Sequence, residues 1–344
     1  MKPNPVSAAV SRAAAYTPGM KCVLIGDLHH FALRVPPHRL LCRRLLAQTN
    51  LWLNRRHQFN HALLPAVVER VASLSPEAVL YSGDLSTSSL ESEFEQARRF
   101  IDAVAGRLPD GRVEVVVPGN HDRYTFRSRR RRRIDQMLGP KVPAAFPDAR
   151  TLAPGWTLLS LDAAKPNVVS SRGALGRKQF DAALTVIQNV PAGQGLAVLC
   201  HYPCSLPSGR TPHWKHALAE AGPLAEALRA CAGRVVYLHG HIHDPWHARP
   251  QEGSGPTAGH ATGSERLLRS GTAIECVNAG APCMRNDDYP LGQGFWELDF
   301  PDEPRAPLGA RHHLPVAPDP TTPPEALWAA SDPASISWRT GPDL

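Results

Sequence analysis

Five groups of Asp, Asn and His residues stand out because each one follows directly on a short apolar run. They are Asp27-Leu28-His29, Gly83-Asp84, Gly119-Asn120-His121-Asp122, His201 and Gly240-His241-Ile242-His243. Carboxylate, amide and imidazole groups together suit divalent transition metals such as Mn, Fe, Zn or Ni. The donors outnumber what one ion needs, and a carboxylate shared between two ions explains the excess. The sequence therefore predicts two divalent metal ions, a common device for phosphoryl hydrolysis.

The apolar runs that position these groups have the length and β-branched composition of buried strands. Strands are expected at 21–27, 78–84, 112–117, 196–200, 234–238, 273–277 and 294–300. Helical patterns lie between them, most clearly at 60–73, 90–108, 176–189 and 223–232. This alternation predicts an α/β domain of mainly parallel strands, where ligands bind at the strand ends. We therefore expect the five groups to meet on one edge of one sheet.

The order D-x-H, G-D, G-N-H-D, H and G-H-x-H resembles the signature of calcineurin-like metallophosphoesterases. The resemblance covers roughly residues 21–300. It implies an α/β fold, a four-layer αββα sandwich with two mixed β-sheets and a dinuclear site at its edge. It implies that one metal is held by Asp27, His29, Asp84 and His243. It implies that the other is held by the bridging Asp84, Asn120, His201 and His241.

The same resemblance implies roles for the two residues that follow Asn120. His121 corresponds to the family's non-ligand histidine, a phosphate contact or general acid. A hydroxide bridging the metals would attack phosphorus, and His121 would help to stabilise the leaving oxygen. Asp122 either orients a catalytic neighbour or caps the turn, and both interpretations are kept. The expected activity is that of a phosphodiesterase or phosphatase.

Substrate contacts are sought among the residues next to these motifs. His30 follows the first motif, and Arg123 and Arg127 follow the third. Residues 129–133 are all Arg, and this run either holds a second phosphate or forms a solvated face. Residues 51–56, which include a Trp, are expected to pack as a cap or in the core, with contact to a membrane surface as the alternative.

The charge balance bounds the partners without choosing among them. Lys and Arg number 38 against 31 Asp and Glu, a net charge of +7. Such a chain attracts phosphorylated small molecules, acidic lipids and nucleic acid. A small phosphoester or pyrophosphate is expected. Resemblance to class III phosphodiesterases implies a cyclic nucleotide or similar diester, and resemblance to the UDP-diacylglucosamine hydrolases implies a lipid-linked pyrophosphate, which the segment around Trp52 mildly favours. A nuclease of the same superfamily is disfavoured, because no nucleic-acid-binding module is recognisable.

The two ends of the chain are expected to lie outside the catalytic domain. We expect an N-terminal segment at 1–20, the phosphoesterase domain at 21–300 and a surface or disordered tail at 301–344, which contains ten Pro. Residues 246–271 are rich in Gly, Ser and Pro and are expected to form a long surface loop. No run approaches the roughly 20 apolar residues of a membrane span. A cytoplasmic location is expected, since seven Cys form no small-domain disulfide framework, and peripheral membrane contact is left open.

Overall fold

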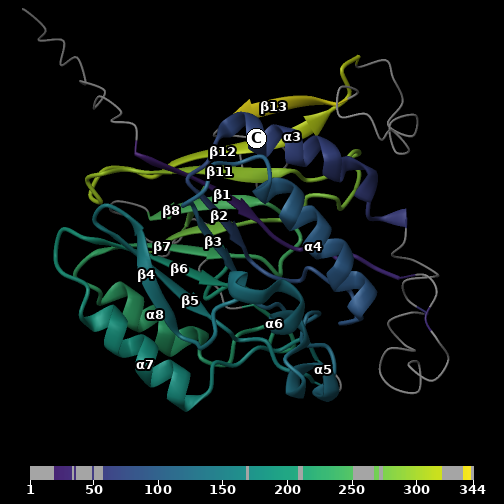
Figure 1. The fold of residues 1–344 in the computed structure, drawn as a ribbon. Coiled ribbons are helices and arrows are strands. Elements are labelled where there is room, and N and C mark those ends of the chain that lie inside the picture. The colour runs from purple at the N-terminus through teal and green to yellow at the C-terminus, as the bar shows by residue number, and fades with distance from the viewer. Residues whose placement is uncertain are drawn as a thin grey trace, which may run out of the picture.

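Two β-sheets lie face to face, and helices cover both of the outer faces (Figure 1). The computed structural model describes residues 19–32, 35, 49, 57–167, 170–207, 212–250, 267–270, 274–319 and 336–341. Three clusters of buried apolar side chains separate the layers, one between the sheets and one under each helical layer. The expected four-layer α/β sandwich with two mixed sheets is therefore confirmed.

The first sheet has the strand order β13-β12-β11-β1-β2-β3. Its strands are β1 (Met20–Ile25), β2 (Ala78–Tyr81), β3 (Val113–Val116), β11 (Phe295–Phe300), β12 (Gly309–Val316) and β13 (Ser337–Gly341). β1, β2 and β3 are parallel, whereas β11, β12 and β13 pair antiparallel. Helices α3 (Leu64–Leu74) and α4 (Glu91–Ala105) pack on the outer face, and a 3-10 turn (His61–Leu63) precedes α3.

The second sheet has the strand order β4-β5-β6-β7-β10-β8-β9. Its strands are β4 (Asp148–Ala153), β5 (Trp156–Leu161), β6 (Gly195–Cys200), β7 (Arg234–His239), β8 (Trp246–Pro250), β9 (Leu267–Ser270) and β10 (Glu275–Asn278). β5, β6, β7 and β10 are parallel, with antiparallel partners beyond them. Helices α7 (Arg177–Gln188) and α8 (Ala221–Arg229) cover this sheet. Short helices α5 (Phe126–Arg130) and α6 (Arg133–Leu138) and a 3-10 turn (Gly139–Lys141) follow β3.

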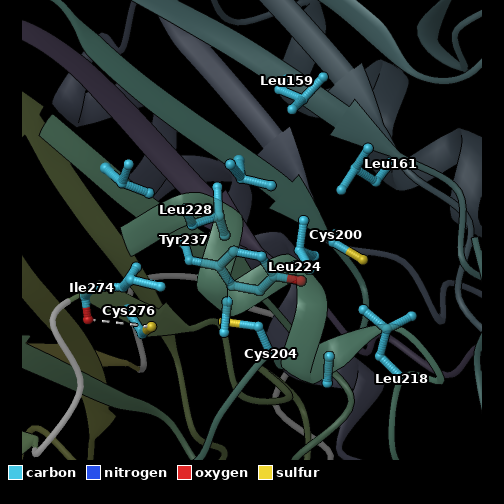
Figure 2. Packing of buried hydrophobic residues seen from close by; sticks show 14 of the residues in the cluster. Leu159, Leu161, Cys200, Cys204, Leu218, Leu224, Leu228, Tyr237, Ile274 and Cys276 are labelled. Atoms are coloured by element: carbon cyan, nitrogen blue, oxygen red, sulfur yellow. Dashed lines mark hydrogen bonds between the residues drawn. The ribbon is translucent and has the colours of Figure 1, made fainter. Parts of the chain in front are cut away.

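Central strands are buried on both faces, which is why they read as continuous apolar runs. In β1, Cys22 and Leu24 face the other sheet, whereas Val23 and Ile25 face α3 and α4. The second sheet behaves in the same way. Cys200, Tyr237 and other side chains from its outer face pack against residues of α8 (Figure 2). Burial on both faces leaves only the strand ends open for polar chemistry.

The expected strands and helices are all present, with shifted ends. The strand expected to run from residue 78 to Asp84 ends at Tyr81. Gly83 and Asp84 have φ values of 95° and 51°, which an extended strand does not allow. These positive φ values both end the strand early and turn Asp84 out of the sheet. The sequence thus indicated the element but placed its end inside the functional loop.

The segments treated as irregular contain further strands. Residues 246–250 and 267–270, expected within a surface loop, form β8 and β9. The Pro-rich tail supplies β12 and β13, so the first sheet continues past residue 300, where the sequence placed the end of the domain. His312 and His313 are buried in β12, and such polar residues conceal the apolar pattern of a strand. The β4–β5 hairpin was also missed.

Candidate metal centre

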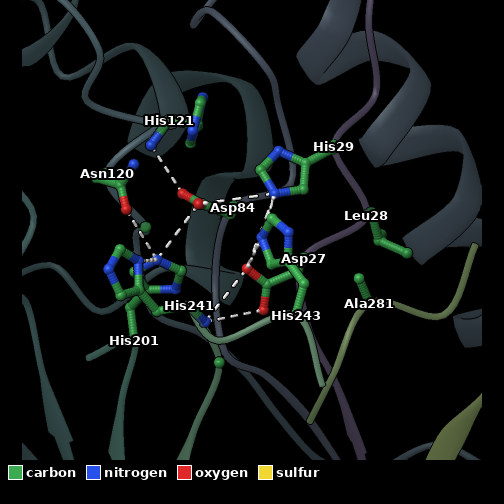
Figure 3. Close-up of polar contacts among 12 residues, drawn as sticks. Asp27, Leu28, His29, Asp84, Asn120, His121, His201, His241, His243 and Ala281 are labelled. Carbon is green, nitrogen blue, oxygen red and sulfur yellow. Dashed lines mark hydrogen bonds and ion pairs between the residues drawn. The ribbon is translucent and has the colours of Figure 1, made fainter. Parts of the chain in front are cut away.

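The five polar groups come together where the carboxyl ends of β1, β2 and β3 meet those of β6 and β7 (Figure 3). They therefore lie at the facing edges of two sheets, which corrects the expectation of one edge of one sheet. The parallel strands of each sheet end on the same side, and stacked sheets lie about 10 Å apart. Loops from both sheets can therefore reach a common centre.

The first group of donors consists of Asp27, His29, Asp84 and His243. One ligand atom from each lies within 4.8 Å of all the others. His243 Nε2 is 2.9 Å from His29 Nε2 and 3.3 Å from Asp27 Oδ1. Asp27, His29 and Asp84 are buried, so the surrounding loops restrict the positions of these side chains.

The second group consists of Asp84, His201 and His241, again with ligand atoms within 4.8 Å of one another. His201 Nε2 lies 3.3 Å from Asp84 Oδ2 and 3.2 Å from His241 Nδ1. Asn120 Oδ1 is 3.1 Å from the same His201 nitrogen, so its amide oxygen adds to this group. Asp84 belongs to both groups, as expected of a carboxylate shared between two ions.

The loops that carry these donors have a strained backbone. Four donors have positive φ values, namely Asp27 (51°), His29 (47°), Asp84 (51°) and His241 (72°). This left-handed region is uncommon for residues other than glycine and costs roughly 1–3 kcal/mol at each position. The fold therefore maintains a set of unfavourable conformations in one place, a pattern that clusters at functional sites.

Two motif glycines allow these loops to approach the carboxylates closely. A Cβ atom on Gly119 would lie 2.1 Å from Asp84 Oδ1, and one on Gly240 would lie 2.3 Å from Asp27 Oδ2. Both separations are shorter than any real carbon–oxygen contact. The glycines of G-N-H-D and G-H-x-H are thus required by the space beside the carboxylates.

Charge balance identifies what the centre can bind. Among the described residues, no Lys or Arg forms an ion pair with Asp27 or Asp84. Burial by itself raises the pKa of Asp84, but nearby His201 and His121 outweigh it and hold the pKa well below its usual range. Burial likewise lowers the pKa of His201, but Asp84 reverses this and raises that pKa to about 9. Buried carboxylates whose only positive neighbours are imidazoles fit divalent metal ions.

Backbone groups orient several of the donors. His201 Nδ1 donates to the carbonyl of Ser82 at 2.8 Å, which directs Nε2 into the centre. The backbone N–H of His241 donates to both oxygens of Asp27, at 3.2 and 3.1 Å. The backbone N–H of His121 donates to Asp84 Oδ1 at 2.7 Å. The sequence gives no signal for Ser82, because it acts through its main chain.

His121 lies at the border of the centre and is partly exposed. Its Nδ1 is 2.6 Å from the carbonyl oxygen of Thr87, which places the ring proton on Nδ1. Its ring contacts His29 at a centroid distance of 4.8 Å and stacks on Tyr124 at 5.5 Å. His121 belongs to neither donor group, and its role as a non-ligand histidine stays a prediction.

Asp122 turns away from the donors and holds two loops together. Its carboxylate accepts hydrogen bonds from the backbone N–H of Gly119 at 3.0 Å, Ser86 at 2.9 Å and Leu85 at 3.3 Å. The Ser86 hydroxyl also donates to it, at 3.0 Å. Burial, and then the charge of Asp84, raise its pKa to about 6. These contacts favour a role in positioning the loops after β2 and β3.

The three expected substrate contacts occupy different environments. His30 is 3% exposed and stacks on His61 at 4.9 Å. Arg123 is buried and forms ion pairs with Asp162 at 2.8 Å and Asp135 at 3.3 Å, and its contact with substrate stays a prediction. Arg127 is exposed on α5, where it remains a candidate. The segment 51–56 lies outside the described residues.

His216 is a neighbour of the centre that the motifs did not indicate. Its ring lies 6.1 Å from that of His241 between centroids. The only signal in the sequence is the local composition His213-Trp214-Lys215-His216, which belongs to no motif.

None of the helices that the structure describes is both long and apolar enough to cross a bilayer.

The fold is similar to that of a solved structure of low sequence identity. The chain resembles PhoD (11% identity, TM-score 0.53, covering 94% of this chain and 72% of that one). Weaker likenesses include a dimetal phosphatase from Danio rerio (14% identity, TM-score 0.48, 82% and 93%) and a phosphopantetheinyl hydrolase from Mycobacterium tuberculosis (12% identity, TM-score 0.40, 89% and 99%). No curated protein matches the sequence.

A family description matches the sequence itself. The match extends over residues 20–245, which contain every donor described above, and the description is that of a calcineurin-like phosphoesterase. It spans well over half of the chain and agrees with the two mixed sheets and the Asp and His donors at their edges. The protein therefore belongs to the calcineurin-like phosphoesterase family.

Proposed function

We propose that this protein is a dinuclear metal-dependent hydrolase that cleaves a phosphoester bond. The observation that carries the proposal is the shared carboxylate: Asp84 belongs to both groups of donors. Membership of the calcineurin-like phosphoesterase family supports the same reaction class. The proposal covers phosphomonoesters and phosphodiesters.

Each residue has a distinct task in this proposal. Asp27, His29, Asp84 and His243 would hold one ion, and Asp84, Asn120, His201 and His241 would hold the other. Two bound divalent ions would polarise the phosphoryl oxygens and lower the pKa of an attacking water.

His121 would assist from the border of the centre. Its partly exposed ring lies beside His29 and its Nδ1 proton is engaged by Thr87, so Nε2 is the nitrogen that would meet a phosphoryl or leaving oxygen. Asp122 would act through the loops that it ties together rather than on the substrate. The chain thus separates ion binding, proton transfer and loop positioning among different side chains.

The proposal is tested with purified protein and bis-p-nitrophenyl phosphate, with and without Mn²⁺. We expect hydrolysis that needs the metal and is abolished by chelation, together with two metal ions per chain by elemental analysis. Asp84→Asn should remove both the activity and the metal. Asp110→Asn, a change at an exposed turn before β3 and so at the end of that strand opposite the donors, is the matched control and should retain both. Full activity in Asp84→Asn would refute the assignment.

A further inference from the structure

Residues 213–216 form a short exposed turn beside the second donor group. All four side chains, His213, Trp214, Lys215 and His216, are exposed. Trp214 is 57% exposed, and among the described residues only Phe126 is a comparably exposed large hydrophobic side chain. An aromatic side chain of this size usually buries most of its surface. Its exposure beside the second donor group indicates a surface that can bind a ligand.

The turn is held in place although its side chains are exposed. The backbone N–H of His216 donates to the carbonyl of His213 at 2.8 Å, which closes the turn. The neighbouring loop ties it down, since Ser171 N–H donates to the carbonyl of Lys215 at 2.9 Å. The Ser171 hydroxyl lies 2.5 Å from His216 Nδ1. The side chains are therefore presented from a fixed backbone, which reduces the entropy cost of binding a ligand.

A series of neighbouring rings connects the turn to the donors. His216 is 6.1 Å from His241, His213 is 6.3 Å from His216 and Trp214 is 5.8 Å from His213, all between ring centroids. Trp214 thus lies three ring spacings from a donor of the second group. A substituent on a phosphoester bound at the centre would reach Trp214 along these rings.

The chemistry of the turn indicates what that substituent is. An exposed indole face stacks on planar rings irrespective of their hydrogen-bonding pattern. The Lys215 ammonium lies 5.6 Å from the centre of the same indole ring, so a positive charge accompanies the stacking surface. Lys215 and His216 can both donate to oxygens between the ring and the phosphorus. A planar group joined to phosphate through an oxygen-rich linker satisfies all three side chains.

We propose that residues 213–216 form a substrate subsite that stacks a planar aromatic ring carried by the phosphoester, with Trp214 as the platform. The inference rests on the proposed function and adds to it a substrate class, esters of a ring-bearing alcohol such as a nucleoside.

The test compares two inhibitors of bis-p-nitrophenyl phosphate hydrolysis that differ by the ring. AMP and ribose 5-phosphate share the sugar and the phosphate, so the ratio of their inhibition constants reports the contribution of the base. In the wild type we expect AMP to bind about tenfold more tightly. Trp214→Ala should reduce the ratio to about one, and Trp214→Phe should keep most of it. Phe126→Ala, which removes the other exposed aromatic side chain, should leave the ratio unchanged.

Two outcomes would overturn the subsite while the hydrolase assignment stands. One is equal inhibition by AMP and ribose 5-phosphate in an active wild type. The other is a preference for AMP that survives Trp214→Ala. If the protein hydrolyses nothing, calorimetric titration of the two compounds into the Mn²⁺-loaded protein gives the same ratio without turnover. The expected preference and its loss in Trp214→Ala would then support the subsite, and equal affinities would refute it.

Discussion

Buried carboxylates meet histidines in two kinds of place in this protein, and their charge balance differs. At the strand ends, Asp27 and Asp84 are surrounded by imidazoles and, among the residues that the structure describes, form no ion pair with Lys or Arg. Within the sheets, Glu275 and Glu297 also contact histidines, but each has Arg beside it. The first arrangement lacks a fixed positive charge and the second contains one.

Glu297 in β11 shows how a structural cluster is completed. Its carboxylate lies 2.8 Å from His313 Nε2 and 2.8 Å from an Arg311 nitrogen, both on the adjacent β12. Lys21 of β1 approaches it at 3.6 Å from the other side. Burial alone would raise the pKa of Glu297, but His313 and Arg311 outweigh this and lower the pKa. No further cation is required.

The backbone differs in the same way as the charge. Glu275 and Glu297 sit in β10 and β11, whose extended conformation is unstrained. Asp27 and Asp84 sit in loops with positive φ. Carboxylates that stabilise the fold thus lie on relaxed strands and are neutralised by the chain. Carboxylates proposed to bind ions lie on strained loops and await an external charge, a contrast that substitutions can test.

Asp84→Asn should have the largest effect on activity. Each of the two proposed ions would contribute several kcal/mol of transition-state stabilisation, and Asp84 is common to both groups, so kcat/KM should fall at least about 10⁴-fold. Metal content by elemental analysis should fall with it. Retention of both the activity and the bound metal in Asp84→Asn would place Asp84 with the structural carboxylates.

His121→Ala should lower kcat by about 100-fold and leave the metal content unchanged. The magnitude is that of a typical proton-transfer group, and His121 lies outside both donor groups. The comparison of interest is with His241→Ala, which removes a donor and should reduce both turnover and bound metal. Loss of metal in His121→Ala would show that its backbone and ring contacts maintain the donors instead.

Glu275→Gln should affect stability and spare the chemistry. Glu275 is buried and contacts His247 Nε2 at 2.8 Å, with Arg234 and Arg249 beside it. Loss of the charge weakens charge-assisted hydrogen bonds, at a cost of about 1.5–3 kcal/mol in the free energy of unfolding. Denaturant titration measures this cost, and kcat/KM of the folded enzyme should stay within twofold. A large loss of activity at full metal content would contradict the division into two classes.

The same contrast explains what the sequence could predict. The sequence indicated the donors because each group follows an apolar run. All five groups also carry Asp, Asn or His side chains, which can bind metal ions. Strand β12 was missed because Arg311, His312 and His313 resemble a surface segment until Glu297 is placed across from them. The ion pair between Arg123 and Asp162 could not be predicted for the same reason, since Asp162 follows a distant strand. Local patterns predict a strand end, whereas the pairing of buried charges depends on tertiary structure.

The smallest expected effect is a pH dependence that distinguishes the two classes of carboxylate. Burial would raise the pKa of Glu275, but His247 and Arg234 outweigh it and lower the pKa. The folded protein therefore binds this proton less readily than the unfolded chain, whose Glu pKa is about 4.3. The stabilisation by Glu275 is present above that value and is lost as the pH falls through the lower folded pKa. The difference in unfolding free energy between the wild type and Glu275→Gln should hence be constant above about pH 5 and shrink below pH 4. A difference that grows on acidification would mean that the neutral carboxyl is the stabilising form, and the contrast with Asp84 would then rest on the backbone alone.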